Sequence, residues 1–508
     1  MANPFDRQPF GSANFATEKE LRDHKLLNDG PAALPLGLAV IDGKTQNKRK
    51  VAYDDERHQL IFGANGSGKS VRMAATAILS WEKERSAVIV DPKGQLAAIT
   101  APWRRKVSDV FVINPFGTLT DLPGYEDLKS CGFNPLLGFD PGSPRFNADA
   151  GLFAEAMITM EGTQPFFPRM ARNLLSGVAM LEVFQAQQDK RPPSLGRVRD
   201  LITDPAGLLG DKDEKDENGK IIKKGKPGIL AQMGASPNRG MRNKAGPLMQ
   251  EARSIRDVIS EVSTQTEFLD DDEMVADMQM PGPDWSQLKK RATTIYLILP
   301  AEMMERHTKW FRLALSAALR AVMRRREPGE LPVSFLLDEY FLIANGGLRI
   351  IENCMAYVRG FGVQLIPMLQ DLNQLQDLYP KRWETFLSNA GVVLHVGPPG
   401  DLTTSEWMSK RAGETTGVSA NMNDNTGTGW SPGPNGEFNV NHSHGGGVSY
   451  GQTRVPFLPV HKLLNTREGF VYAWKQGLAN TILTEAPIYD NSVLGLKGRF
   501  RRDPYYLG

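Results

Sequence analysis

Apolar residues along the chain form short continuous runs separated by segments of helical spacing. HQLIF (58–62) is followed by a glycine-rich turn, a helical segment at 71–84 and a second apolar run, SAVIVD (86–91). A further run, VSDVFVINP (107–115), continues the pattern. Strands that are continuously apolar are typical of a parallel sheet that is covered on both faces. This order of elements predicts an α/β fold.

Helical spacing replaces the strand pattern in the next part of the chain. Apolar residues recur with helical periodicity in 148–160, 170–187 and 248–264. We therefore predict an all-α domain at 147–280, inserted into the α/β fold. Within it, the charge-dense stretch 211–226 is expected to be a solvated loop.

Strand-like runs then resume towards the C-terminus. They are ATTIYLILP (292–300), VSFLLDEY (333–340), GVQLIPMLQ (362–370) and AGVVLHVG (390–397). Residues 415–452 are rich in Gly, Ser, Asn and Thr and have almost no aliphatic pattern, which predicts a long exposed loop.

Composition narrows the class of protein. The 508 residues are 41% hydrophobic and 23% charged, enough to bury sizeable cores. Sixty basic and 58 acidic side chains leave a net charge of +2, so a nucleic-acid surface would have to be a local patch. The only cysteines are Cys131 and Cys354, which excludes a disulfide scaffold or a cysteine-built zinc site. No apolar run reaches the roughly 18 residues of a membrane span, and the N-terminus lacks signal-peptide features, so we expect a cytoplasmic chain.

One motif identifies a phosphate site. Residues 63–70, GANGSGKS, match G-x-x-x-x-G-K-[ST] between a strand-like run and a helix. Glycines let the backbone curl so that N–H groups point at phosphate oxygens, Lys69 reaches the β/γ-phosphates, and Ser70 holds Mg²⁺. The motif therefore predicts a site for ATP and Mg²⁺. The candidate nucleotide-binding residues in this loop are Gly63, Ala64, Asn65, Gly66, Ser67, Gly68, Lys69, Ser70 and Val71.

Two carboxylates follow the apolar run that begins at Val333. Asp338 is expected to orient the Mg²⁺ shell, with Ser70, and Glu339 to polarise the attacking water. A strand that ends in a solvated acidic pair is the alternative; the presence of the P-loop favours the catalytic role.

Arg359 and Gln370 lie at further suggestive positions. In a ring of such domains, an arginine at a subunit edge reaches the neighbour's γ-phosphate, and a glutamine at a strand's carboxyl end senses it. A surface salt bridge for Arg359 and a helix cap for Gln370 are the alternatives, and spacing alone leaves both open.

Taken together, the ordered segments resemble the type IV coupling proteins, the TraG/TraD-like conjugative DNA-transfer ATPases. The resemblance runs through most of the chain, over GSANFATEKELR (11–22), HQLIFGANGSGKS (58–70), SAVIVDPKGQL (86–96), FNPL (133–136), FFPRMARNLLSG (166–177), TTIYLILPAE (293–302), FLLDEY (335–340), RGFGVQLIPMLQDLNQL (359–375), SNAGVVLHVG (388–397), DLTTSEWMSKRAGETT (401–416) and RRDPYY (501–506). It implies a RecA-like P-loop NTPase core with an inserted all-α domain. It also implies a hexamer around a channel, and ATP hydrolysis coupled to delivery of substrate into a type IV secretion channel.

The resemblance assigns roles to the candidate residues. It makes Lys69 and Ser70 the Walker A pair and Asp338 and Glu339 the Walker B pair. Further residues fall where the family places an arginine finger (Arg359) and a glutamine sensor (Gln370).

A second element of the family lies close to the nucleotide. Asp91 and Lys93 match its DPKGE motif, in which Gln95 replaces the usual glutamate.

The expected organisation has four parts. They are an N-terminal extension (1–50), the first part of the nucleotide-binding domain (51–146), the all-α domain (147–280), and the second part of the nucleotide-binding domain (281–508), with the long loop and C-terminal strands. Family members usually carry an N-terminal transmembrane region, which is not seen here. A separate membrane partner or a truncation is therefore expected, with the chain peripheral at the inner membrane.

The implied partners are single-stranded DNA with its relaxase, components of the type IV secretion channel and other copies of the chain. Two alternatives remain: the same ATPase exports protein effectors without DNA, or the chain is a nucleotide-dependent assembly scaffold. The basic helix end at 320–326 either contacts phosphates in a channel or at a subunit seam, or is a solvated face. The basic and aromatic tail at 499–506 either binds single strands or is a peripheral tail that packs on a neighbour.

Overall fold

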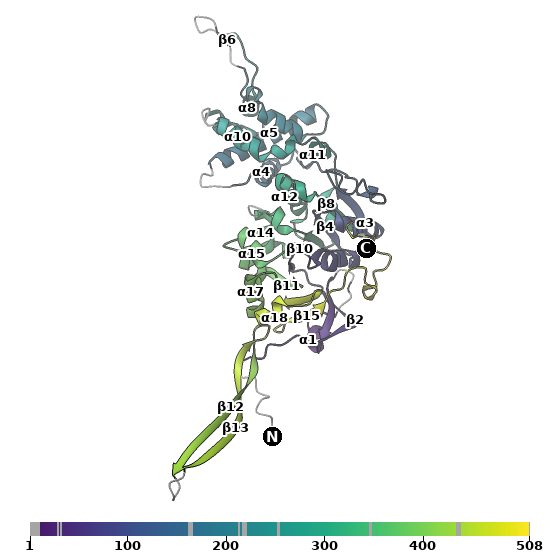
Figure 1. Ribbon diagram of the computed structural model, residues 1–508. Helices are drawn as coiled ribbons and strands as arrows, with labels where there is room; N and C mark the ends of the chain where they lie inside the picture. The colour runs from purple at the N-terminus through teal and green to yellow at the C-terminus, as the bar shows by residue number, and fades with distance from the viewer. Residues whose placement is uncertain are drawn as a thin grey trace.

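The chain forms an α/β body with an all-α block at one end and a long two-stranded ribbon at the other (Figure 1). The computed structural model describes residues 11–27, 30, 33–160, 166–211, 214–215, 221–250, 255–344, 348–432 and 438–506.

An 11-stranded sheet forms the centre of the body in the described part of the chain, with strand order β2-β1-β15-β14-β11-β3-β10-β9-β4-β8-β5. Its strands are β1 (Leu34–Ile41), β2 (Lys44–Tyr53), β3 (His58–Phe62), β4 (Ser86–Asp91), β5 (Asp109–Ile113), β8 (Thr293–Ile298), β9 (Val333–Leu337), β10 (Val363–Leu369), β11 (Ala390–Val396), β14 (Phe470–Lys475) and β15 (Ile482–Glu485). All strands from β11 to β5 in this order run parallel. The remaining strands, β14, β15, β1 and β2, add antiparallel at one side.

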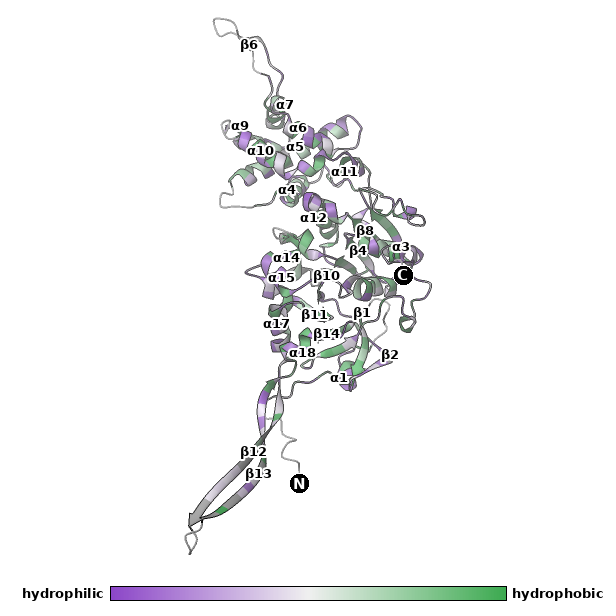
Figure 2. Cartoon of the chain, in the orientation of Figure 1, coloured by the Kyte–Doolittle hydropathy of each residue, from purple (hydrophilic) through white to green (hydrophobic). Residues whose placement is uncertain are grey.

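The interior strands are buried along their whole length, which explains their continuous apolar pattern. Successive residues face two different cores: Leu60 and Phe62 lie in one, and Ile61 lies in the other. Helices α2 (Ala75–Ser80) and α3 (Gln95–Val107) cover one face of the sheet. Helices α12 (Met304–Val322) and α14 (Arg349–Tyr357) cover the opposite face. The strands between these two helical layers carry many hydrophobic residues (Figure 2). The predicted α/β fold with a mainly parallel sheet is confirmed.

The other helices of the body surround this sheet. They are α1 (Glu18–Asp23), α13 (Tyr340–Ile343), α15 (Leu372–Leu378), α16 (Trp383–Asn389), α17 (Leu402–Ala412) and α18 (Val460–Leu464).

A block of helices connects β5 to β8, in the range where the sequence predicts an inserted all-α domain. Its helices are α4 (Phe146–Met157), α5 (Phe166–Gln188), α6 (Leu195–Thr203), α7 (Pro205–Leu209), α8 (Ile229–Gly234), α9 (Arg239–Gln250), α10 (Ile255–Gln265) and α11 (Asp272–Asp277). Helix α5 is the central one and packs against α4, α6, α8, α9 and α10. The stretch 211–226 is not simply a loop, because it contains two short paired strands, β6 (Glu214–Lys215) and β7 (Ile221–Lys223).

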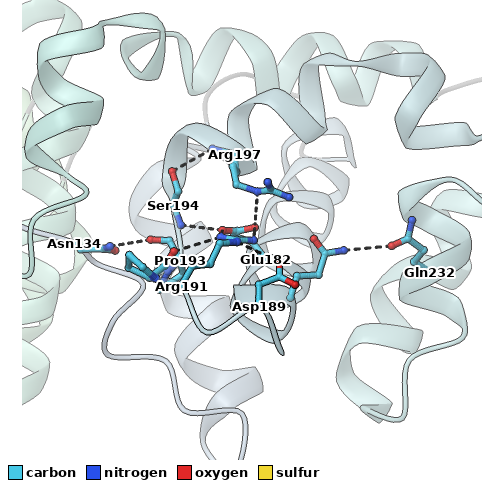
Figure 3. Close-up of polar contacts among 10 residues, drawn as sticks. Asn134, Glu182, Asp189, Arg191, Pro193, Ser194, Arg197 and Gln232 are labelled. Carbon is cyan, nitrogen blue, oxygen red and sulfur yellow. Dashed lines mark hydrogen bonds and ion pairs between the residues drawn. The ribbon is translucent and has the colours of Figure 1, made fainter. Parts of the chain in front are cut away.

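A buried carboxylate ties the end of α5 to α6 (Figure 3). The side chain of Glu182 is fully buried, and the guanidinium of Arg191 donates hydrogen bonds to both of its carboxylate oxygens. The bond from Nη2 to Oε2 measures 2.9 Å. Arg197 Nε donates to Oε2 at 3.2 Å and Ser194 N donates to Oε1 at 2.9 Å. The same connection reaches the body, because Asn134 Nδ2 donates to the carbonyl that precedes Ser194 at 2.9 Å.

The prediction of a long exposed loop at 415–452 is wrong. Instead, β12 (Glu414–Pro432) and β13 (Phe438–Pro456) form an antiparallel ribbon of 19 residues per strand that projects from the body (Figure 1). In its register Val418, Met422, Val448 and Tyr450 share one face and are exposed. Glycine, serine and asparagine occupy most positions of the other face, so the apolar alternation is diluted and composition alone suggests a loop.

Candidate nucleotide site

The glycine-rich segment 63–70 joins β3 to a π-helical turn, η2 (Lys69–Ala74). Gly66 and Gly68 have φ values of 78° and 84°, a left-handed conformation that glycine adopts without strain. The loop curls around Lys69, whose Nζ donates to the carbonyl of Ala64 at 3.3 Å and to that of Gly63. The segment therefore has the curled shape that a phosphate-binding loop requires.

The carboxylates predicted at the end of β9 lie beside this loop. Ser70 Oγ donates to Asp338 Oδ2 at 2.9 Å, and Asp338 is 6% exposed. The backbone N–H of Glu339 donates to Asp338 Oδ1 at 3.1 Å. Glu339 has a φ of 49°, a left-handed conformation that is rare outside glycine and often occurs at functional sites. Residues that are far apart in sequence thus converge at the carboxyl ends of β3 and β9.

Burial and mutual charge perturb the ionisable groups of this cluster. Burial lowers the pKa of Lys69, while the carboxylates of Glu339 and Asp338 oppose that change. Burial raises the pKa of Asp338, and the charge of Glu339 raises it further, whereas the Ser70 hydrogen bond and Lys69 lower it. The charges of Lys69 and Asp338 therefore stabilise one another, whereas burial and the neighbouring carboxylate of Glu339 disfavour the charged form of Asp338.

Gln370 is attached to the phosphate-loop segment. It follows β10, and its Nε2 donates to Asn65 Oδ1 at 3.4 Å, while Gly63 N donates to its carbonyl at 3.2 Å. It does not cap α15, because Asp371 accepts the helix N–H there. The backbone of Arg359 lies in the short 3₁₀ turn Val358–Phe361, and its side chain lies outside the described residues.

Two other predicted contact residues use their side chains within the protein. Asp91 ends β4, and its Oδ2 accepts the N–H of Ala97 at 2.8 Å, at the start of α3. Burial raises the pKa of Asp91 to about 7, and the nearby charge of Asp338 also raises it. Val71 is buried in the core on the α2 side of the sheet. Both residues adjoin the site, with their side chains turned into the fold.

The residues present fit a nucleotide with Mg²⁺. The hydroxyl of Ser67 is buried and has no hydrogen-bond partner among the described residues, so it is available to a phosphate oxygen. Within the described ranges, no three His, Cys, Asp or Glu side chains are arranged to hold a metal. Mg²⁺ binds through one or two protein ligands, water and substrate phosphates, and the Ser70 hydroxyl and the Asp338 carboxylate would supply the protein ligands.

His395 is a neighbour of the site that the sequence interpretation missed. It is the second-to-last residue of β11, opposite Phe62 of β3, and its Nδ1 lies 3.1 Å from the carbonyl of Gly397. Burial, assisted by the charge of Lys69, lowers the pKa of His395 to about 4. Its Nε2 is buried without a partner in the described structure. A lone imidazole in a continuous apolar run is the signal that could have identified it.

The basic segment after α12 is engaged within the chain. Arg326 Nη1 pairs with Glu56 at 2.7 Å, and Arg324 pairs with Glu330. Arg324 and Arg326 therefore pair with carboxylates of the same chain at the protein surface, which favours the solvated-face alternative over phosphate contact.

Comparison with known proteins identifies the family. Residues 7–431 match the family model described as type IV secretory system conjugative DNA transfer. The chain belongs to this family. Among its curated relatives, a conjugal transfer protein TraG of Escherichia coli is 25% identical over 446 residues, covering 80% of this chain and 65% of TraG. The type IV secretion system-coupling protein VirD4 of Bartonella quintana is 22% identical over 378 residues, covering 71% of this chain and 53% of VirD4.

Solved structures with a similar fold agree with this architecture. The plasmid coupling protein TrwB in complex with ADP and Mg²⁺ matches with a TM-score of 0.59 at 15% identity, covering 95% of each chain. TrwBdeltaN70, described as a bacterial conjugative coupling protein, matches with a TM-score of 0.59 at 14% identity, covering 95% of this chain and 94% of the other. These matches confirm the RecA-like P-loop NTPase fold.

Two further observations concern the extent of the match and membrane-spanning helices. It spans 65% of the length of the TraG relatives. Among the described residues, no helix has both the length and the apolar character needed to cross a bilayer.

Proposed function

We propose that this member of the conjugative DNA transfer family is a Mg²⁺-dependent ATPase motor that drives single-stranded DNA, with its relaxase, into a type IV secretion channel. The hydrogen bond between Ser70 and Asp338 carries the proposal, because it joins the phosphate loop to the carboxylates of β9. Family membership and the TrwB complex with ADP and Mg²⁺ support the choice of ligand.

Each residue of the site has a distinct task in this proposal. Lys69 holds the β/γ-phosphates. Ser70 and Asp338 would hold Mg²⁺, which would supply positive charge against the transferred phosphoryl group. Glu339 orients and polarises the attacking water. Gln370, tied to the loop through Asn65, senses the γ-phosphate.

The motor is proposed to work as a ring, with a hexamer as the expected form. Arg359 completes the site of the neighbouring subunit, where such fingers raise the rate by about 10³–10⁵. Channel components, and a membrane anchor supplied by a partner or by further sequence, complete the assembly at the inner membrane.

The test is the ATPase rate against protein concentration, with and without single-stranded DNA. We expect the specific rate to rise with concentration until rings saturate, and to rise again with DNA. Lys69→Ala should abolish the activity, whereas Lys462→Ala, at an exposed lysine of α18, should not. DNA-indifferent hydrolysis would favour protein effectors as substrate. A Lys69→Ala chain that still supports transport would favour a scaffold.

A mixing experiment tests the shared site. Lys69→Ala and Arg359→Ala subunits are each expected to be inactive, but mixed rings contain interfaces with an intact lysine on one side and an intact arginine on the other. Recovered activity supports action between subunits, and no recovery in rings shown to be mixed argues against it.

A further inference from the structure

The last described residues, 499–506, cross the nucleotide-binding body. The guanidinium of Arg499 lies 4.2 Å from the ring centre of Trp103, and that of Arg501 lies 4.3 Å from the ring centre of Tyr125. Arg501 Nε also donates to the carbonyl of Ala98 in α3 at 2.8 Å. Cation–π contacts and charged hydrogen bonds therefore fix this tail across α3.

Beyond these arginines, the tail contacts the turn that follows β4. Asp503 is 5% exposed, and its Oδ2 accepts a hydrogen bond from Gln95 Nε2 at 2.7 Å. Its Oδ1 accepts the N–H of Tyr505 at 3.0 Å, and the Tyr505 hydroxyl donates to the carbonyl of Lys93 at 2.6 Å. The tail thus holds the turn 91–95 at two of its residues.

This turn leads directly to the carboxylates of the nucleotide site. The Asp91 carbonyl accepts the N–H of Gly94 at 3.1 Å, and its side chain caps the start of α3. Strand β4 pairs with β9, and Asp338 N donates to the carbonyl of Val90 at 3.3 Å. A displacement of the turn would therefore move the end of β4, to which Asp338 is bonded.

The residue at position 95 suits this arrangement. Its amide donates to the buried carboxylate of Asp503, whereas the glutamate implied by the family resemblance would place two carboxylates in contact. Gln95, which replaces the glutamate implied by the family resemblance, is thus the residue that can donate a hydrogen bond to Asp503 in the tail.

We propose that Gln95 and Asp503 are a positioning pair, through which the C-terminal segment 499–506 holds the turn 91–95 and aligns Asp338 for catalysis. This proposal rests on the proposed ATP hydrolysis. Neither residue lies in the phosphate loop, so the pair should affect the turnover rate rather than the binding of ATP.

A charge-exchange cycle in the full chain tests the pair. Gln95→Glu should lower kcat for ATP about 10-fold, with KM changed less than about 2-fold, because small misplacement of a reacting group is costly. The double variant with Asp503→Asn should return kcat to within about 3-fold of the original chain, since the new carboxylate accepts from the new amide. Glu82→Gln is the matched control: it breaks the 3.2 Å pair with Arg499 but leaves the turn alone, and should keep kcat unchanged.

The pH profile separates positioning from a general loss of structure. Two carboxylates in contact share a proton at lower pH, so the Gln95→Glu deficit should shrink between pH 8 and pH 6, and the double variant should show no such change. An unchanged kcat in Gln95→Glu, an equal loss in the double variant, or a rise in KM alone overturns the proposal. If the original chain is no more active than Lys69→Ala, the proposed function fails first, and the positioning proposal fails with it.

Discussion

Removing one guanidinium from the buried carboxylate in the all-α block should loosen that block measurably. Glu182 has no exposed side-chain surface, and Arg191 contacts both of its oxygens while remaining 25% exposed. Breaking a buried ion pair from one side costs about 3–5 kcal/mol. Because Arg197 and the Ser194 N–H still contact the carboxylate, we expect Arg191→Ala to cost about 2–3 kcal/mol of local stability.

Arg197→Ala is the matched control. Its side chain is 50% exposed and makes a single 3.2 Å contact, so its removal should cost less than about 1 kcal/mol. Glu182→Gln, which keeps an acceptor for Ser194 N, should cost about 1–2 kcal/mol.

Hydrogen exchange read by mass spectrometry is the suitable assay, since a chain with several parts does not unfold in two states. For Arg191→Ala, protection of residues 182–203 should fall roughly 30- to 150-fold, which corresponds to about 2–3 kcal/mol. Strands β4 and β9 should keep their protection. Equal losses for Arg191→Ala and Arg197→Ala, or an unchanged 182–203 segment, would refute the reasoning that burial of the carboxylate sets the cost.

Three further perturbations have defined outcomes. Replacing residues 418–452 with two glycines should shift Tm by less than about 2 °C in scanning fluorimetry and leave ATP hydrolysis within about 2-fold, because the ribbon pairs mainly with itself; a larger loss of either would contradict this. Burial lowers the pKa of His58 to about 4, so the unfolded chain binds the extra proton first and the His58 contribution lowers stability by up to about 3 kcal/mol as pH drops from 6.5 to 4. His58→Asn, which keeps an acceptor for Leu365 N, should make the urea midpoint fall less steeply over that range than in the original chain, because the His58 contribution is removed while that of another buried histidine, His395, remains; an unchanged slope would contradict it. Ser70→Ala should raise the Mg²⁺ concentration for half-maximal hydrolysis about 10-fold or more, whereas Ser80→Ala, at a helix hydroxyl bonded to its own backbone, should leave the Mg²⁺ titration unchanged; identical curves would exclude Ser70 as a ligand.

The sequence predicted the parts of the fold whose signals are local. Each interior strand is recognisable because burial on both faces requires apolar residues at every position, as at 86–91. The phosphate loop is recognisable because its glycines and Lys69 must occur at fixed spacing. Strand order was not predictable, since it depends on which distant segments pair.

Weak patterns explain the errors. The ribbon at 414–456 alternates apolar and small polar residues, but glycine, serine and asparagine are so frequent that composition outweighed alternation. The stretch around β6 and β7 is dense in charge, which hides two very short strands. In both segments each strand pairs with the other strand of the same hairpin. The prediction failed because the sequence pattern does not show which residues of the two strands lie opposite one another.

Contacts between residues far apart in the chain were the least predictable and are the most informative for function. Asp91 was expected at the nucleotide, yet its carboxylate is used to cap α3, and the influence of this turn on the site passes through the backbone of β4 instead. The tail supplies the other half of the arrangement, because Asp503 meets Gln95 from 408 positions away. A glutamine in place of a family glutamate carries no meaning on its own, since an amide and a carboxylate have nearly the same shape. Because Asp503 is buried against Gln95, the glutamine at position 95 must be the donor of the hydrogen bond and the aspartate its acceptor. Exchanging the charges at these two positions therefore tests directly whether the tail affects catalysis.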